Sequence, residues 1–123
     1  MVGRLSGPVT RELTADREHK AGNLIADAQL AATRDEGAEI AFINNGGVRA
    51  DLIPAADGSI TYGQIFAMQP FGNNLVVKTL TGAQLKALLE QQRFDSGERP
   101  FVLFPSRGFE FAYDLSRPAG VMA

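Results

Sequence analysis

Apolar residues recur at intervals of three and four positions between about Lys20 and Asp35, which is the period of one helical face. This stretch predicts a first helix, and we expect Gly37 to end it. Residues 39–43 come next and predict a strand, whose apolar run is too continuous for a half-exposed position, so we expect a central strand. The apolar positions of the helix are Ala21, Leu24, Ile25, Ala28, Ala31 and Ala32.

Two later helices are predicted to begin at a capping box, in which a threonine hydroxyl and a glutamine side chain exchange hydrogen bonds with each other's backbone N–H groups. The boxes are Thr61 with Gln64 and Thr81 with Gln84. Apolar residues flank each box at the positions that a hydrophobic staple requires. Pro70 is expected to end the first of these helices near Met68, whereas the second extends to about Gln92.

Three further stretches of the sequence predict strands. Residues 74–80 carry β-branched side chains, and residues 101–104 and 109–114 suit a hairpin around a turn at 105–108. Strands that alternate with helices and end in a hairpin predict an α/β (α+β) fold, with a mixed β-sheet flanked by helices. We expect residues 1–15 to form an N-terminal connector or short edge strand, and residues 16–123 to form the domain itself.

The composition limits the chain to one globular domain. Its 123 residues are 45% hydrophobic and 21% charged, which argues against disorder, and the net charge of −2 lacks the basic excess of a nucleic-acid binder. Because there is no cysteine and only one histidine, we predict no metal site and no catalytic residue, and we expect the chain alone to be inactive in hydrolysis. We also expect no membrane span and no signal peptide, since no apolar run is long enough.

The segment from Asn44 to Arg49 is the most informative part of the chain, because it follows the predicted buried strand and ligands bind at strand ends in α/β sheets. Gly46 and Gly47 let backbone N–H groups approach an anion closely. The amides of Asn44 and Asn45 are able to hydrogen-bond the polar edge of a ligand, and Arg49 offers a bidentate fork to phosphate or carboxylate. The alternative is a tight turn in which a structural salt bridge holds Arg49.

Arg17, Phe71 and His19 each allow a structural and a functional interpretation. Arg17 either pairs with its acidic neighbours or joins Arg49 around one phosphate. Phe71 lies in a predicted loop, where it either stacks on a planar base or plugs the core beneath the turn. His19 has no clustered ligands to complete a metal site, so we expect a surface or capping histidine.

Five motifs follow one another along the chain, from about Asp16 to Pro118. They are Arg17-Glu18-x-x-x-Gly22-Asn23-Leu24-Ile25-Ala26-Asp27-Ala28, Asn44-Asn45-Gly46-Gly47-Val48-Arg49, Gly58-Ser59-Ile60-Thr61-Tyr62-Gly63-Gln64-Ile65-Phe66, Gln69-Pro70-Phe71-Gly72-Asn73 and Leu80-Thr81-Gly82. Taken together, they resemble the C-terminal domain of the 5′-nucleotidase family. Five motifs in the right order are a specific match.

This resemblance implies a role for each candidate residue. Arg17 and Arg49 would grip the phosphate and ribose region of a nucleotide, and Asn44 and Phe71 would contact the nucleoside. Gly46 and Gly47 would complete the substrate-binding loop. The resemblance places the hydrolytic chemistry in a separate N-terminal metallophosphoesterase domain that holds two divalent metal ions. It also implies export of the parent protein to the periplasm or the extracellular side.

Two departures from the family pattern qualify these expectations. Asn45 stands where the family usually has the first of three glycines, and the chain stops at Ala123, before a second aromatic residue and a Gly-Gly-Asp stretch. We therefore expect a partial domain with open sheet edges, which favour a homo-oligomer or a domain swap. Two other functions stay open: the substrate domain of a 2′,3′-cyclic-nucleotide 2′-phosphodiesterase, and a non-catalytic ligand-binding or assembly module.

Overall fold

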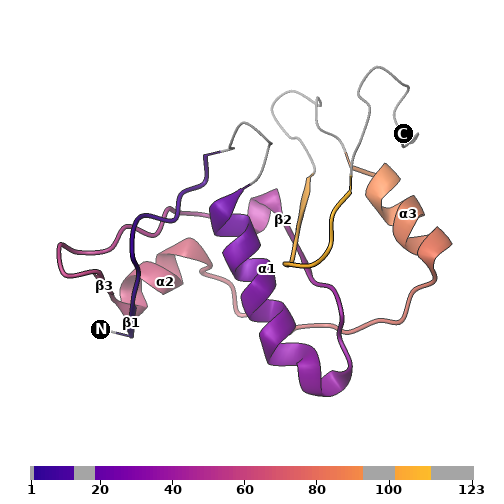
Figure 1. Cartoon of the computed structure of the whole chain (residues 1–123), viewed down its shortest axis with the longest axis horizontal. Coiled ribbons are helices and arrows are strands. Elements are labelled where there is room, and N and C mark those ends of the chain that lie inside the picture. The colour runs from indigo at the N-terminus through magenta and orange to yellow at the C-terminus, as the bar shows by residue number, and fades with distance from the viewer. Residues whose placement is uncertain (1, 13–18, 93–101, 112–123) are drawn as a thin grey trace.

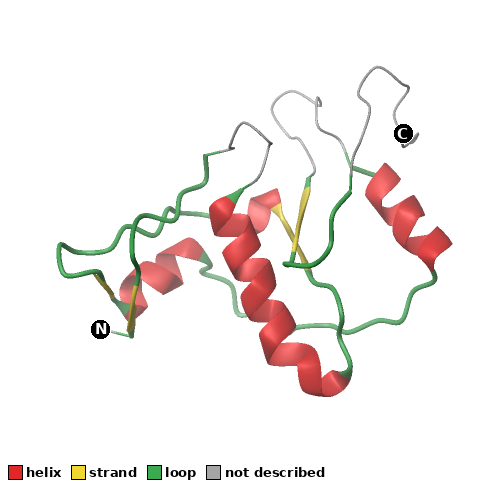
Figure 2. Cartoon of the chain, in the orientation of Figure 1, coloured by secondary structure: helices red, strands yellow, loops and turns green. Residues whose placement is uncertain are grey.

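The computed structural model describes residues 2–12, 19–92 and 102–111. Figures 1 and 2 show that helices and short strands share these residues, which confirms the expected α+β class. The helices are α1 (Lys20–Thr33), α2 (Tyr62–Met68) and α3 (Gly82–Glu90), with 3₁₀ turns η1 (Arg34–Glu36) and η2 (Asn45–Gly47). The strands are β1 (Gly3–Arg4), β2 (Phe42–Asn44), β3 (Ser59–Ile60) and β4 (Leu103–Pro105).

The described strands form two antiparallel pairs, β1 with β3 and β2 with β4. In the second pair Ile43 lies opposite Phe104, and side chains extend the ladder at both ends. The Ala41 N–H donates to Oγ of Ser106 (2.9 Å), and the Val102 N–H donates to Oδ1 of Asn45 (3.1 Å). The hairpin predicted between residues 101–104 and 109–114 is therefore wrong where it is described, because β4 takes its backbone partners from β2 and residues 109–111 form no strand.

The N-terminal residues run beside the segment that leads into α2. The Val9 and Leu52 backbones exchange hydrogen bonds of 2.9 and 2.8 Å, and the Leu5 N–H donates to the Gly58 carbonyl (2.7 Å). Two of these residues form the short strand β1. Gly58 has a φ of +85°, which suits the turn before β3.

Helix α1 packs against both β2 and β4, with Figure 1 showing it across the middle of the molecule. It begins at Lys20 as predicted and ends at Thr33, two residues earlier than expected, where a 3₁₀ turn continues the chain. The Gly37 N–H closes that turn onto the Arg34 carbonyl at a φ of +85°. The predicted apolar face is only partly right, because Leu24 and three alanines are exposed. The buried residues are Ala21, Gly22, Ile25, Ala26 and Leu30. The helix thus presents its glycine to β4, where the smallest side chain permits the closest approach.

Both capping boxes are present in full. Thr61 accepts from the Gln64 N–H, Thr81 accepts from the Gln84 N–H, and each glutamine side chain returns a bond to the threonine N–H. Helix α2 ends at Met68, as Pro70 predicts. Helix α3 is two residues shorter than expected, since its last helical residue is Glu90 and Gln92 instead bonds the Leu103 N–H through Oε1 (2.9 Å).

The strand predicted at residues 74–80 does not form. These residues are exposed and lie along a groove of about 490 Å³, whose other wall includes residues 36–42. The strand propensity of valine and threonine does not supply the partner that a ladder needs, and no described strand pairs with this segment. The strand β2 is likewise half-buried rather than central, because β4 is the one described strand that pairs with it.

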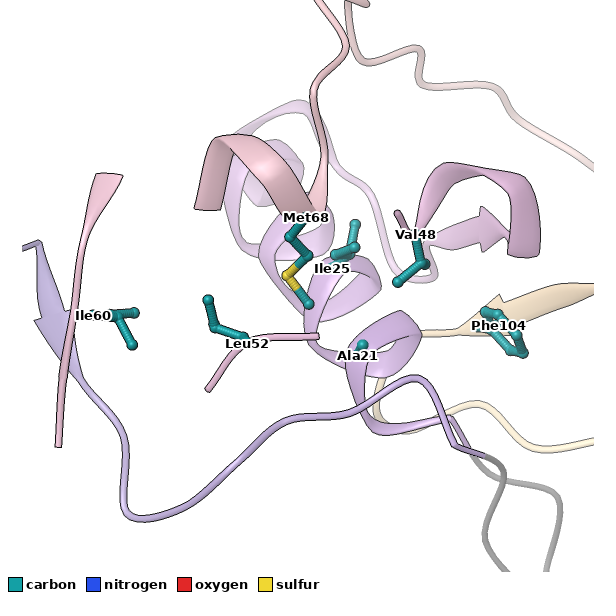
Figure 3. Packing of buried hydrophobic residues seen from close by; sticks show 7 residues of the cluster. All are labelled: Ala21, Ile25, Val48, Leu52, Ile60, Met68 and Phe104. Carbon is teal, nitrogen blue, oxygen red and sulfur yellow. The ribbon is translucent and has the colours of Figure 1, made fainter. Parts of the chain in front are cut away.

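The core joins the first helix to the loops around it. Met68, Ile25 and Val48 approach one another, with Ala21 and Phe104 on one side and Leu52 and Ile60 on the other (Figure 3). Val48 belongs to the loop of the candidate site, and Met68 ends α2 just before the loop that carries Phe71. The core therefore fixes two segments that carry predicted binding residues.

Candidate functional site

The loop after β2 is held to β4 by Asn45. The Asn45 N–H donates to the Val102 carbonyl (2.9 Å), while its Oδ1 accepts from the Val102 N–H (3.1 Å). A glycine at this position would keep the first bond and lose the second. Asn45 therefore anchors the loop to the neighbouring strand, a role that the sequence analysis missed.

Neither Gly46 nor Gly47 has a positive φ, so close packing rather than backbone conformation favours a glycine here, most strongly at Gly47. A Cβ on Gly47 would lie 2.8 Å from Cδ1 of Ile43 and 3.1 Å from Oδ1 of Asn44. A Cβ on Gly46 would lie 3.1 Å from Nδ2 of Asn44. The Asn44 amide thus lies beside the glycine turn, and it is exposed and accessible to a ligand.

Arg49 and Phe71, far apart in the sequence, lie together. The Arg49 N–H donates to the Met68 carbonyl (2.8 Å), which ties the loop to the end of α2. The Arg49 guanidinium carbon then lies 5.4 Å from the centroid of the Phe71 ring, a cation–π contact. Both side chains are exposed, Phe71 by 41%.

Within the described residues, this geometry goes against the structural alternatives for Arg49 and Phe71, and their binding roles stay predictions. Among the described residues no carboxylate forms an ion pair with Arg49, so the structural salt bridge is not found there. Phe71 does not plug the core, because its ring is exposed and lies under the guanidinium. Arg17 lies outside the described residues.

His19 is a buried capping residue at the start of α1. Its Nδ1 accepts from the Gly22 N–H (2.8 Å), and its ring stacks on Phe104 with a centroid distance of 4.2 Å. Burial lowers the pKa of His19 below its usual 6.5, since desolvation penalises the charged ring. The capping role is confirmed and the surface position is wrong. The stacking on Phe104 had no signal in the sequence.

An open hollow of about 410 Å³ connects the loop with the start of α1. Asn45 and Val48 line it from the loop, and His19 lines it from the helix. Arg11 and Asp51 line it as well and form an ion pair of 3.5 Å at the surface, so the cation and the anion offset each other. The hollow thus lies between the loop that follows β2 and the start of α1.

No three side chains of the His, Cys, Asp or Glu type are placed together so as to hold a metal ion within residues 2–12, 19–92 and 102–111. Over the same ranges, no helix has the length and apolar character needed to span a bilayer.

Comparison with known proteins points in one direction. The family described as 5′-nucleotidase, C-terminal domain, matches residues 1–121. The trifunctional nucleotide phosphoesterase protein YfkN of Bacillus subtilis (strain 168) is 39% identical over 112 residues, which cover 89% of this chain and 7% of that protein. The cell wall protein Lmo0130 of Listeria monocytogenes is 43% identical over 97 residues, covering 75% of this chain and 12% of that protein.

The human 5′-nucleotidase is 30% identical over 111 residues, which cover 85% of this chain and 19% of the human protein. The chain thus spans less than a fifth of the length of each of these three relatives. No solved structure matches it significantly. Because the family match extends over nearly the whole sequence, this chain belongs to the family of 5′-nucleotidase C-terminal domains.

Proposed function

We propose that this chain is the substrate-recognition domain of a 5′-nucleotidase-type phosphoesterase that dephosphorylates nucleotides. The phosphate binds to Arg49 together with Arg17, the base stacks on Phe71, and Asn44 hydrogen-bonds the nucleoside. Gly46 and Gly47 keep the loop backbone open to the ligand. The observation that carries this proposal is the position of the Arg49 guanidinium, 5.4 Å from the centroid of the Phe71 ring.

The two side chains suit the two ends of a nucleotide. A guanidinium makes paired charge-assisted hydrogen bonds to phosphate oxygens, and no described carboxylate competes for Arg49. An exposed aromatic ring stacks on any base, a contact worth about 1–3 kcal/mol by substitution. The hydrogen bond from the Arg49 N–H to the Met68 carbonyl holds the backbone that carries the phosphate-binding side chain beside the segment that leads to Phe71.

The hydrolytic step belongs to a different part of the parent protein. The described residues offer no cluster of His, Cys, Asp or Glu side chains that could hold a metal ion. We propose that an N-terminal metallophosphoesterase domain with two divalent ions performs the reaction on the nucleotide that this domain holds. The names of the relatives, which include a nucleotide phosphoesterase, a 5′-nucleotidase and a cell wall protein, support this activity and a location outside the cell or at its surface. We propose that the parent protein is periplasmic or extracellular.

Calorimetric titration with 5′-AMP tests the recognition role on the chain as it stands. We expect Phe71→Ala to weaken binding at least fivefold, from the loss of about 1–3 kcal/mol of stacking. We expect Arg49→Ala to weaken it about tenfold or more, because a charge-assisted hydrogen bond is worth about 1.5–3 kcal/mol. Phe66→Ala and Arg107→Ala, at exposed positions away from the contact, are the matched controls. Binding that neither site variant weakens would refute the proposal.

We further propose that the chain self-associates. Four large apolar side chains are exposed along residues 75–80, on one wall of the groove that β2 borders. They are Leu75, Val76, Val77 and Leu80. Exposed extended segments of this composition pair readily with another copy.

A further inference from the structure

The guanidinium of Arg49 lies over the ring of Phe71, at 5.4 Å from its centroid. A base that stacks on Phe71 also occupies a face of this ring. Arg49 is exposed and has no ion pair among the described residues, so this ring is the contact that positions its charged end. The group proposed to bind phosphate therefore covers one face of the ring proposed to stack on the base.

The backbone of Arg49 is held in place, while its side chain is exposed. The Arg49 N–H is bonded to the Met68 carbonyl, and Val48 beside it is buried in the core. An exposed cation–π contact contributes about 0.5–1 kcal/mol, whereas a hydrogen bond from a charged group contributes about 1.5–3 kcal/mol. A phosphate group at the loop is thus the stronger partner for the guanidinium, and it draws Arg49 away from the ring.

We propose that Arg49 acts as a cover for Phe71 that phosphate binding removes, so that the phosphate and base subsites are positively coupled. This inference rests on the proposed function. It makes the site selective for a nucleotide over the corresponding nucleoside in two ways. A nucleoside lacks the phosphate contact, and it must also displace the guanidinium from the ring without compensation.

Separate probes for the two subsites test the coupling, with adenosine as the base probe and inorganic phosphate as the phosphate probe. We expect saturating phosphate to tighten adenosine binding about two- to fivefold in the unaltered chain, which is the fold-change that corresponds to an exposed cation–π contact. We expect Arg49→Ala to tighten adenosine binding by the same factor without phosphate, and to abolish the effect of phosphate. Arg107→Ala, which removes an exposed arginine from the turn after β4, should behave like the unaltered chain.

The two proposals fail in different ways. If Arg49→Ala weakens 5′-AMP binding but leaves adenosine binding unchanged or weaker, the cover is refuted and the recognition site stands. If neither Arg49→Ala nor Phe71→Ala alters 5′-AMP binding, the site itself is refuted. Where adenosine binds too weakly for calorimetry, the ring proton resonances of Phe71 replace it. They should move toward their Arg49→Ala positions when phosphate is added, and unchanged resonances would overturn the inference.

Discussion

His19 caps the first helix in a way that only a neutral imidazole allows. Its Nδ1 accepts the Gly22 N–H, so that nitrogen carries no proton, and its ring is buried against Phe104. Arg11 and Asp51 line the same hollow, where the positive charge of Arg11 lowers the pKa of His19 and the negative charge of Asp51 raises it. Burial is the larger effect and lowers the pKa of His19 in the folded chain.

Stability should therefore depend on pH through His19. Because the folded-state pKa lies below the unfolded value of 6.5, the contribution of this group is complete above pH 6.5 and is lost as the pH falls through the folded pKa. We expect the free energy of unfolding to fall by at most about 1.4 kcal/mol per pH unit in that window. Denaturant titrations between pH 5 and 8 measure it. His19→Asn keeps a capping side chain and should flatten the dependence, and an unchanged slope in that variant would contradict the assignment.

At the scale of elements, α1 meets β4 at Gly22. A Cβ there would lie 2.7 Å from Cγ of Phe104, a distance that forces the helix and the strand apart. We expect Gly22→Ala to lower the free energy of unfolding by about 1–3 kcal/mol through overpacking, although alanine favours helices by about 1 kcal/mol. Gly82→Ala is the matched control, because it lies at the start of α3 with nothing within 4 Å of the added Cβ. Equal stability of the two variants in denaturant titrations would contradict this packing.

The same scale explains what the sequence could and could not predict about the fold. The capping boxes at Thr61 and Thr81 depend on residues three positions apart, so local sequence was enough to place both helix starts. Strand pairing depends on a distant partner, which local propensity does not specify. Residues 74–80 have the composition of a strand and no described partner, while β4 pairs with β2 instead of the segment that follows it.

At the scale of the whole molecule, the sequence indicated the residues of the candidate site one by one. It did not indicate that they lie together, because their contact arises only in the folded chain. The glycine-rich loop with Arg49, and Phe71 after Pro70, were identified from their motifs. Their contact depends on the bond from Arg49 to Met68, which no pattern in the sequence indicated. The anchoring role of Asn45 likewise depends on Val102, which lies next to it only in the folded chain.

Self-association is a property of the whole chain, and we expect it to depend on the exposed segment at residues 75–80. Val76 is 74% exposed, so Val76→Lys should leave the fold intact while opposing contact between two copies. Light scattering over a range of concentrations should give a mass above that of one chain for the unaltered protein and the mass of one chain for Val76→Lys. Val2→Lys, at an exposed position in the N-terminal arm, should still associate. An unaltered chain that stays monomeric at high concentration would rule out the oligomer.

The most direct test of the recognition site is to map the position of bound nucleotide by NMR on the labelled chain. Titration with 5′-AMP should shift the amide resonances from Asn44 to Arg49 and the ring resonances of Phe71. The amide resonances of residues 75–80, which line the groove opposite residues 36–42, should not shift. Saturable shifts at the loop and at Phe71 together are the result we expect. Shifts confined to other parts of the chain, with both of these segments unaffected, would contradict the account.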